Sequence, residues 1–297
     1  MQARHEGKQM QDTLERFIFD DAPVRGELVQ LDAAYKEVLA RHPYPPVLQK
    51  LIGELMSAAM LLSATLKFDG TLIMQMHGVG AVKLIVVEVT SEHTIRAMAR
   101  WEGDVPDVSL GELLGHGKFM ITLDPNEGEA YQGIVGFESG QGVAEIIEHY
   151  MAHSEQLETR LWLACLDGKT AGLLVQKLPA GQGDPDAWDR VQKLSETITT
   201  EELLGLAPRD ILYRLFHQEQ VRVFDPADPR FACTCSRDRV GSMLRMVGKD
   251  EVDSVVVEKG HVDVTCEFCG KGYHFDAIDV AQLFHGHGTH TPDGRVH

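Results

Sequence analysis

Four of the five cysteines gather near the C-terminus in two short-range pairs. Cys233 and Cys235 form a C-x-C motif, and Cys266 and Cys269 form a C-x-x-C motif. Two such pairs, brought together by the fold, supply four thiolates in the tetrahedral set that Zn²⁺ prefers. Glycines follow the second pair and permit the tight turn of a zinc knuckle, whose backbone amides face sulfur. The spacing therefore predicts one zinc ion held by these four residues.

Thiolates are also the form of cysteine that reacts with oxidants. Cysteines two apart can close a strained disulfide, and such bonds are readily reversed. A C-terminal module of about fifty residues has a thin core, and zinc can contribute on the order of 10–16 kcal/mol to the folding of such a unit. Oxidation of the thiols would remove the ligands and unfold the module. The residues alone leave two interpretations open, a redox switch and a permanent zinc staple.

Other residues with chemical potential point to less specific roles. The pair Cys266 and Cys269 could act as a dithiol oxidoreductase, but the sequence around it lacks a thioredoxin-like βαβ pattern. Cys165 lies in an apolar strand pattern and is predicted to be buried and inert. His149 and His153 lie four apart without the glutamate of an H-E-x-x-H motif, which favours a solvated helix face. No phosphate-binding glycine loop is present, so we predict a non-enzymatic protein that uses no nucleotide.

The overall composition is that of an ordinary globular protein. The chain has 297 residues, of which 43% are hydrophobic and 25% charged. Its net charge of −17 argues against a nucleic-acid partner. The most apolar stretch, 47–66, contains Lys50 and Glu54 and predicts a core helix and no membrane span. Without a secretory signal at the N-terminus, we expect a cytoplasmic protein whose thiols are kept reduced.

The order of strand and helix patterns along the sequence predicts an α+β fold. In residues 1–178, strand follows strand with few helices between them, so the sheet should be mainly antiparallel. Strands are expected at 14–19, 71–77, 82–90, 94–100, 119–124, 131–138, 159–165 and 172–178, and helices at 33–41, 47–66 and 143–156.

A helical linker, 179–230, and a zinc module with a disordered tail, 231–297, are expected to follow the N-terminal domain. Helices in the linker are predicted at 187–198, 200–206 and 209–218, with a capping box at Thr199 and Glu202 and a helix start near Pro208. In the module, strands are predicted at 254–259 and 261–266 before a short terminal helix. The tail histidines could bind metal weakly, but a solvated tail is the preferred interpretation; they are His285, His287, His290 and His297.

Several runs together resemble the redox-regulated 33 kDa heat-shock chaperonin family. The C-terminal runs are RLFHQEQVRVF (214–224), FACTCSRDRV (231–240) and VTCEFCGKGYHFD (264–276). The N-terminal runs are LLSATLKFDGTLIMQMHGVG (61–80) and the segment 131–164, which begins YQGIVGFESG. The resemblance covers residues 12–283, and the C-x-C/C-x-x-C pairing is the family's hallmark.

The resemblance implies an ATP-independent holdase that binds unfolding client proteins under oxidative and heat stress. The reduced form is implied to be inactive, with one zinc ion per chain on Cys233, Cys235, Cys266 and Cys269. Oxidation is implied to form the disulfides Cys233–Cys235 and Cys266–Cys269, release zinc, unfold the linker and module, and favour a homodimer. A constitutive zinc-stapled interaction or regulatory protein is the alternative interpretation.

Overall fold

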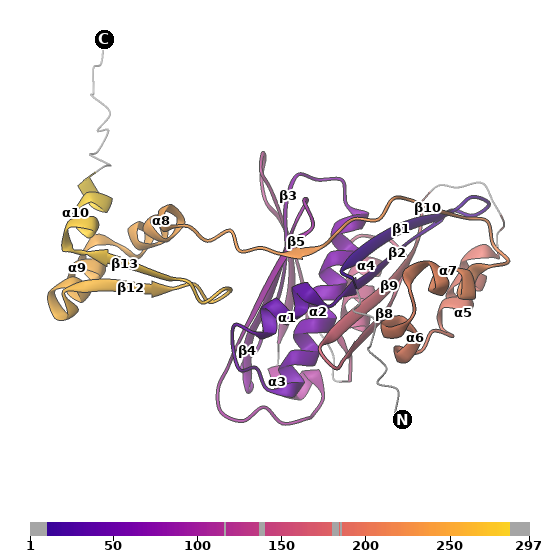
Figure 1. Cartoon of the computed structure of the whole chain (residues 1–297), viewed down its shortest axis with the longest axis horizontal. Coiled ribbons are helices and arrows are strands. Elements are labelled where there is room, and N and C mark those ends of the chain that lie inside the picture. The colour runs from indigo at the N-terminus through magenta and orange to yellow at the C-terminus, as the bar shows by residue number, and fades with distance from the viewer. Residues whose placement is uncertain (1–10, 116, 137–139, 180–183, 185, 286–297) are drawn as a thin grey trace, which may run out of the picture. The chain divides into compact units, whose positions relative to one another are not determined.

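The computed structural model describes residues 11–115, 117–136, 140–179, 184 and 186–285 (Figure 1). The chain divides into two compact units, Met1–Ala232 and Cys233–His297. Each unit has its own hydrophobic core, and the four clustered cysteines all belong to the second unit.

Two sheets form the framework of the first unit within the described residues. One sheet has the order β10-β1-β2-β9-β8, with β1 Thr13–Phe19, β2 Val24–Leu31, β8 Thr159–Leu166, β9 Lys169–Lys177 and β10 Val221–Val223. The other has the order β11-β5-β4-β3-β6-β7, with β3 Gly70–His77, β4 Val82–Thr90, β5 Thr94–Trp101, β6 Lys118–Pro125, β7 Tyr131–Gly136 and β11 Arg230–Phe231. Neighbouring strands in this unit are antiparallel except β11, which runs parallel to β5. The α+β class with a mainly antiparallel sheet is confirmed.

A long central helix fills the core of this unit. The helices before the linker are α1 Ala33–Leu39, α2 Pro46–Thr65, α3 Leu110–Leu114 and α4 Val143–His153. Although α2 is long and apolar enough to cross a membrane, 72% of its most apolar window is buried inside the protein. It packs against strands of both sheets, and its small residues, such as Ser57 and Ala58, allow this close approach. The prediction of a core helix is confirmed.

Strand β2 is one of the elements of this unit that the sequence analysis did not predict; the others are α3, β10 and β11. Its two edges pair with β1 and β9, and α2 and α7 pack against it, so nearly all of its residues are buried and its side chains show no apolar–polar alternation. Position 26 requires glycine because a Cβ there would lie 2.1 Å from the ring of Phe17. Glu27 is also buried. A strand that is central and carries Gly and Glu in its interior does not show the usual periodicity.

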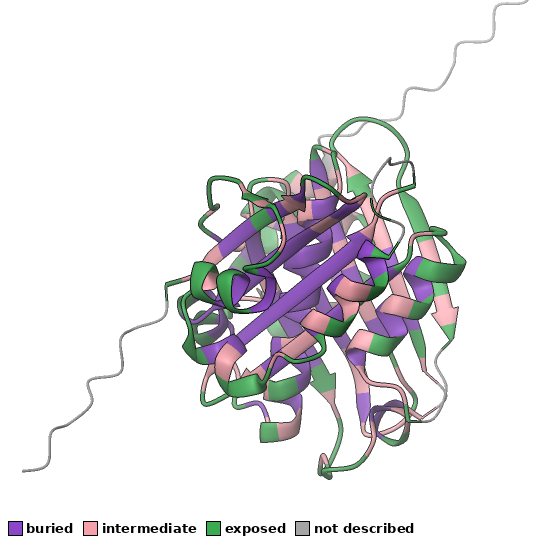
Figure 2. Cartoon of the chain, turned by 90° about the vertical axis from the view of Figure 1, so that its right-hand side faces the viewer, coloured by how far each residue is buried: buried purple, intermediate pink, exposed green. Residues whose placement is uncertain are grey.

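The linker helices cover the outer face of the β10-β1-β2-β9-β8 sheet. They are α5 Ala187–Ser195, α6 Thr200–Gly205 and α7 Pro208–Phe216. The capping box at Thr199 and Glu202 and the start of α7 at Pro208 are both confirmed. Buried linker side chains, including Trp188, Ile211 and Phe216, form one cluster with side chains of the sheet. The central strands β2 and β9 of this sheet are buried over most of their length, and Figure 2 draws buried residues in purple. Packing against the sheet therefore stabilises these short helices.

Short ladders of hydrogen bonds hold the chain between α7 and Ala232. Strand β10 pairs with β1, and the backbone N–H of Ala227 donates to the carbonyl of Leu14 at 2.9 Å. Strand β11 then pairs with β5, where the N–H of Ala232 donates to the carbonyl of Ile95 at 3.2 Å. These ladders are only three and two residues long, so they make few interactions.

The buried Glu27 predicts a pH dependence of stability. Burial raises the pKa of its carboxyl from 4.5 to about 8, although Arg25 and Arg16 oppose the rise. The folded state thus keeps a proton that the unfolded chain releases, so the free energy of unfolding should fall as the pH rises from about 4.5 to about 8. Glu27→Gln should remove this pH-dependent fall in the free energy of unfolding and stabilise the protein by about 1–3 kcal/mol near neutral pH.

Urea unfolding at about pH 5 and about pH 8 measures this effect. The stabilisation by Glu27→Gln should be larger at the higher pH, and Glu201→Gln, at an exposed position, should show no such difference. An equal effect of Glu27→Gln at both pH values would mean that Glu27 does not hold its proton in the folded state.

The second unit is a small module around a β-hairpin. Its elements are α8 Arg237–Val247, α9 Lys249–Lys259, β12 His261–Thr265, β13 Gly272–Asp276 and α10 Ala277–His285. Its core among the described residues consists of Val240, Leu244, Val252, Val262, Tyr273, Phe275 and Val280. So few buried apolar side chains leave the module dependent on additional stabilisation.

The predicted strand at 254–259 is wrong, because this segment belongs to α9. The run of β-branched valines suggested a strand, but Val252 and Val256 lie four apart and pack on one helix face against the core. Gly260, with φ of 81°, ends the helix in the left-handed conformation. The predicted strand at 261–266 is confirmed as β12, and the terminal helix as α10. The tail beyond His285 lies outside the described residues.

Candidate metal centre

The four predicted cysteines converge in the second unit. Cys233 and Cys235 lie just before α8, and Cys266 and Cys269 lie in the turn between β12 and β13. All four Sγ atoms lie within 4.8 Å of one another. The Sγ atoms of Cys233 and Cys266 are 3.7 Å apart, and those of Cys235 and Cys269 are 3.4 Å apart. Sulfurs around one tetrahedral Zn²⁺ would lie about 3.8 Å apart, so this donor set fits such an ion.

The turn that carries the C-x-x-C pair is closed by backbone hydrogen bonds. The N–H of Gly270 donates to the carbonyl of Cys266 at 2.8 Å, and the N–H of Cys266 donates to the carbonyl of Lys271 at 2.9 Å. Gly270 has a φ of 73°, which other residues adopt at a cost. This glycine therefore shapes the knuckle that presents Cys266 and Cys269.

The surroundings of the sulfurs favour the thiolate at Cys235 and oppose it at Cys266 and Cys269. Burial acts to raise the pKa of Cys235, but hydrogen bonds from Tyr273 and neighbouring thiols outweigh it and lower the pKa to about 7. Burial raises the pKa of Cys266 and raises that of Cys269 to about 12. Backbone N–H groups near both sulfurs favour their ionised forms. A divalent cation would supply the positive charge that four adjacent thiolates require.

Tyr273 is a functional neighbour that the sequence analysis missed. It lies on β13, its ring is buried in the core of the module, and its hydroxyl donates to the Sγ of Cys235 at 3.1 Å. This contact crosses from the hairpin to residues 233–235, which we call the C-x-C arm, and holds the Cys235 sulfur in place. Its position four residues after Cys269 was visible in the sequence, but the contact depends on how the hairpin meets the C-x-C arm.

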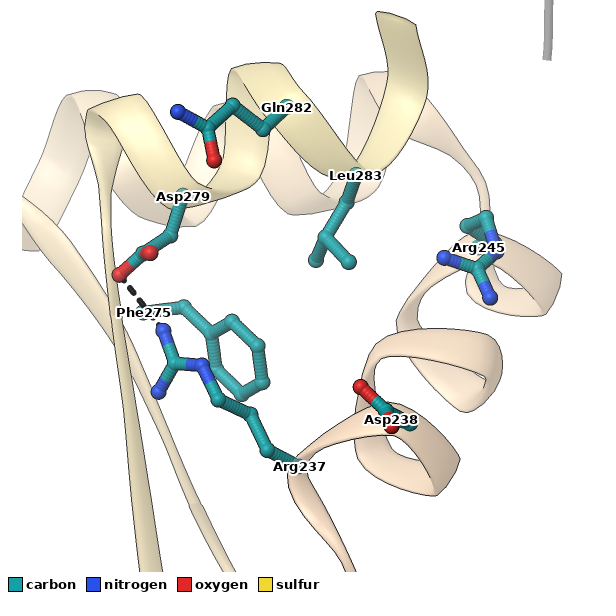
Figure 3. Close-up of a pocket in the computed structure, with 7 residues that line it drawn as sticks. All are labelled: Arg237, Asp238, Arg245, Phe275, Asp279, Gln282 and Leu283. Atoms are coloured by element: carbon teal, nitrogen blue, oxygen red, sulfur yellow. Dashed lines mark ion pairs between the residues drawn. The ribbon is translucent and has the colours of Figure 1, made fainter. Parts of the chain in front are cut away.

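The C-x-C arm is fixed at its junction with α8. The side chain of Ser236 accepts a hydrogen bond from the N–H of Arg239 and caps the helix. Arg237 pairs with Asp279 of α10 at 2.7 Å and stacks over the Phe275 ring at 4.2 Å, both beside a shallow pocket (Figure 3). Arg237 therefore ties the residues after Cys235 to both β13 and α10.

The remaining candidates lie outside this centre. Cys165 lies on β8, where its thiol is partly buried and donates to the Tyr35 hydroxyl at 3.3 Å, and burial raises its pKa. This environment agrees with an unreactive cysteine. His149 and His153 are exposed on α4 with their rings stacked 4.0 Å apart, and no third ligand joins them in the described clusters. None of the five cysteines, all of which lie in the described part of the chain, forms a disulfide in this structure.

Comparison with known proteins shows the family. The sequence profile described as "Hsp33 protein" matches residues 12–276, which include all four clustered cysteines. The chain belongs to the Hsp33 family. The resemblance found in the sequence is thereby confirmed, and the cysteine cluster described above lies within the matched region.

Individual relatives agree with this membership. The chain is 51% identical over 276 residues to the "33 kDa chaperonin" of Chromobacterium violaceum, covering 92% of this chain and 94% of that protein. It is 47% identical over 277 residues to the protein of the same name from Neisseria meningitidis, covering 92% and 91%. The crystal structure of a 33 kDa chaperonin from Thermotoga maritima matches with a TM-score of 0.78 at 22% identity, covering 92% and 97%. That structure supports the Hsp33 fold of the chain.

Proposed function

We propose that the chain is a redox-regulated chaperone that holds unfolding proteins and prevents their aggregation. The observation that carries the proposal is the gathering of four cysteine Sγ atoms within 4.8 Å of one another in a module with a small core. Membership of the Hsp33 family supports it, since its relatives are named chaperonins. The proposed ligands of one Zn²⁺ are Cys233, Cys235, Cys266 and Cys269.

The reduced centre would join two segments of the module that are distant in the sequence. Bound Zn²⁺ would supply a divalent charge that stabilises the thiolates and fixes the C-x-C arm to the hairpin turn. The proposed oxidation joins Cys233 to Cys235 and Cys266 to Cys269. Each pair loses two electrons as its S–S bond forms, and a peroxide accepts them as its O–O bond breaks to give water. Disulfides have no anionic sulfur to offer a metal, so the module would lose its main stabilising interaction.

The linker is the proposed second part of the switch. Its helices hide apolar side chains against the sheet, among them Ile211, Leu215 and Phe216. The short β10 and β11 ladders connect these helices to Cys233. Opening of the module would release this segment from its C-terminal end, and the helices, which depend on packing, would detach and expose apolar surface to clients.

We also propose domain boundaries, an oligomeric state and a cellular location for the protein. We assign the chaperone domain to 1–178, the linker to 179–230 and the redox module to 231–297. The open form would assemble as a homodimer through its exposed apolar surface. It would work in the cytoplasm, where thiols are kept reduced, as a binding protein without nucleotide or catalytic turnover.

Metal content and client protection, measured before and after oxidation, test the proposal. The reduced protein should contain one zinc per chain and leave the light scattering of a heat-denatured client unchanged. Peroxide under mild heat should release the zinc and yield a protein that suppresses the scattering, and reduction with zinc present should restore the first state.

Equal suppression by the reduced and oxidised proteins would contradict the switch. An oxidised protein that keeps its zinc and its far-UV signal would instead support the constitutive zinc-stapled protein. Catalytic turnover of a disulfide substrate would support the oxidoreductase.

A further inference from the structure

The solvent-facing side of the β12–β13 hairpin gathers two imidazoles and a carboxylate. His261 and Asp263 lie two apart on β12, and His274 on β13 is directly opposite Asp263. Because side chains alternate along a strand, these three share one face, while Val262 points into the core of the module. The group is therefore separate from the thiols and from the apolar core.

The distances within this group suit a shared ion. Nδ1 of His274 lies 2.7 Å from one carboxylate oxygen of Asp263, and Nε2 of His261 lies 3.0 Å from the other. The three ligand atoms all lie within 4.8 Å of one another. Ligands at about 2.1 Å from one ion would lie about 3.0–3.4 Å apart, so small side-chain rotations would bring all three to it.

The backbone around the three side chains is held in place. The carbonyl of His274 accepts a hydrogen bond from Arg237 at 2.6 Å. Asp276, which faces His261 across the hairpin, is engaged elsewhere, because its Oδ1 accepts hydrogen bonds from the N–H groups of Ile278 and Asp279.

We propose that His261, Asp263 and His274 bind a second divalent metal ion of the Zn²⁺ type. Two imidazoles and one carboxylate suit borderline cations, whereas Ca²⁺ and Mg²⁺ favour sites built wholly from oxygen. Solvent would fill the remaining coordination positions, because the side chains are exposed. This site has two neutral imidazoles and one negative charge, whereas four thiolates carry four negative charges. It therefore binds its ion more weakly than the thiol centre does and exchanges it with solution.

Binding at this site would join β12 to β13. The ligand set exists only when the two strands are paired in register, so the ion binds the folded hairpin and not the unfolded chain. At a free metal concentration about ten times the Kd, opening of the hairpin should become about tenfold rarer. The site thus stabilises the hairpin that carries Cys266 and Cys269, and this conclusion does not depend on the proposed chaperone activity.

Zinc titration of the reduced, zinc-loaded full chain, followed by amide NMR, tests the site. Zn²⁺ is the suitable probe because it does not oxidise thiols. The protein should carry His285→Ala, His287→Ala, His290→Ala and His297→Ala to remove competing tail ligands. Amide signals of β12 and β13 should shift and saturate with one added equivalent, and their hydrogen exchange should slow about tenfold at ten times the Kd.

Two variants locate the ion. Asp263→Asn keeps the size of the side chain but removes its charge, and His274→Ala removes an imidazole; both should abolish the shifts while the thiol centre keeps its own zinc. His149→Ala, at an exposed histidine of α4, should leave the titration unchanged. Absence of shifts in the hairpin up to millimolar Zn²⁺, or unchanged shifts in both site variants, would overturn the proposal.

Discussion

A reduced protein carrying Cys266→Ser is expected to lose nearly all of its bound zinc and the fold of residues 233–285. A serine hydroxyl stays neutral near pH 7, so the centre would keep three sulfurs and a poor fourth ligand. Metal binding can contribute on the order of 10–16 kcal/mol to a small zinc unit. The core of this module, built around Tyr273 and Phe275, is too small to replace that contribution.

Metal analysis and amide NMR of the reduced variant measure this effect. Signals of the module should collapse to the positions of an unfolded chain, while those of β1–β9 stay dispersed. Cys165→Ser is the matched control, because that thiol lies in the first unit, where it donates to the Tyr35 hydroxyl. A folded module in metal-free Cys266→Ser protein would show that zinc is not what stabilises it.

Phe216→Ala is expected to release the linker helices from the sheet without any oxidant. The ring is 2% exposed and packs against Phe17 and Phe19, with centroids 5.9 and 5.1 Å away. Loss of a buried aromatic side chain costs about 3–5 kcal/mol. Because α5, α6 and α7 are short, a cost of this size is large relative to the stability of the linker itself.

Hydrogen exchange of the linker amides in the reduced protein measures the release. Exchange in α5–α7 should rise by orders of magnitude in Phe216→Ala, and the zinc content should not change. Tyr213→Ala, on the same helix at a side chain that is 74% exposed, should exchange like the parent protein. If released linker surface binds clients, reduced Phe216→Ala should also suppress aggregation. Unchanged exchange would show that the linker does not depend on this contact.

The contribution of tertiary structure is clearest where the local pattern misled. The valine run at 254–259 has strand propensity, yet helix α9 forms because Val252 and Val256 reach the core from one helix face. Strand β2 carries Gly26 and Glu27, and its central place depends on pairing with β9, which lies far away in the sequence, as well as with the preceding strand β1. In both segments long-range packing outweighs the propensity of the residues.

The two short-range cysteine pairs and the caps of the linker helices were determined by the sequence, since each depends on spacing within a few residues, and the α+β class followed from the order of strand and helix patterns along the chain. Only the tertiary structure placed Tyr273 against Cys235, set His261 and Asp263 beside His274, and laid Phe216 on the sheet. Those contacts join residues on different strands and helices, so they form only when these elements pack together. Local spacing fixes which groups a chain can offer, but the packing of distant elements decides which groups meet.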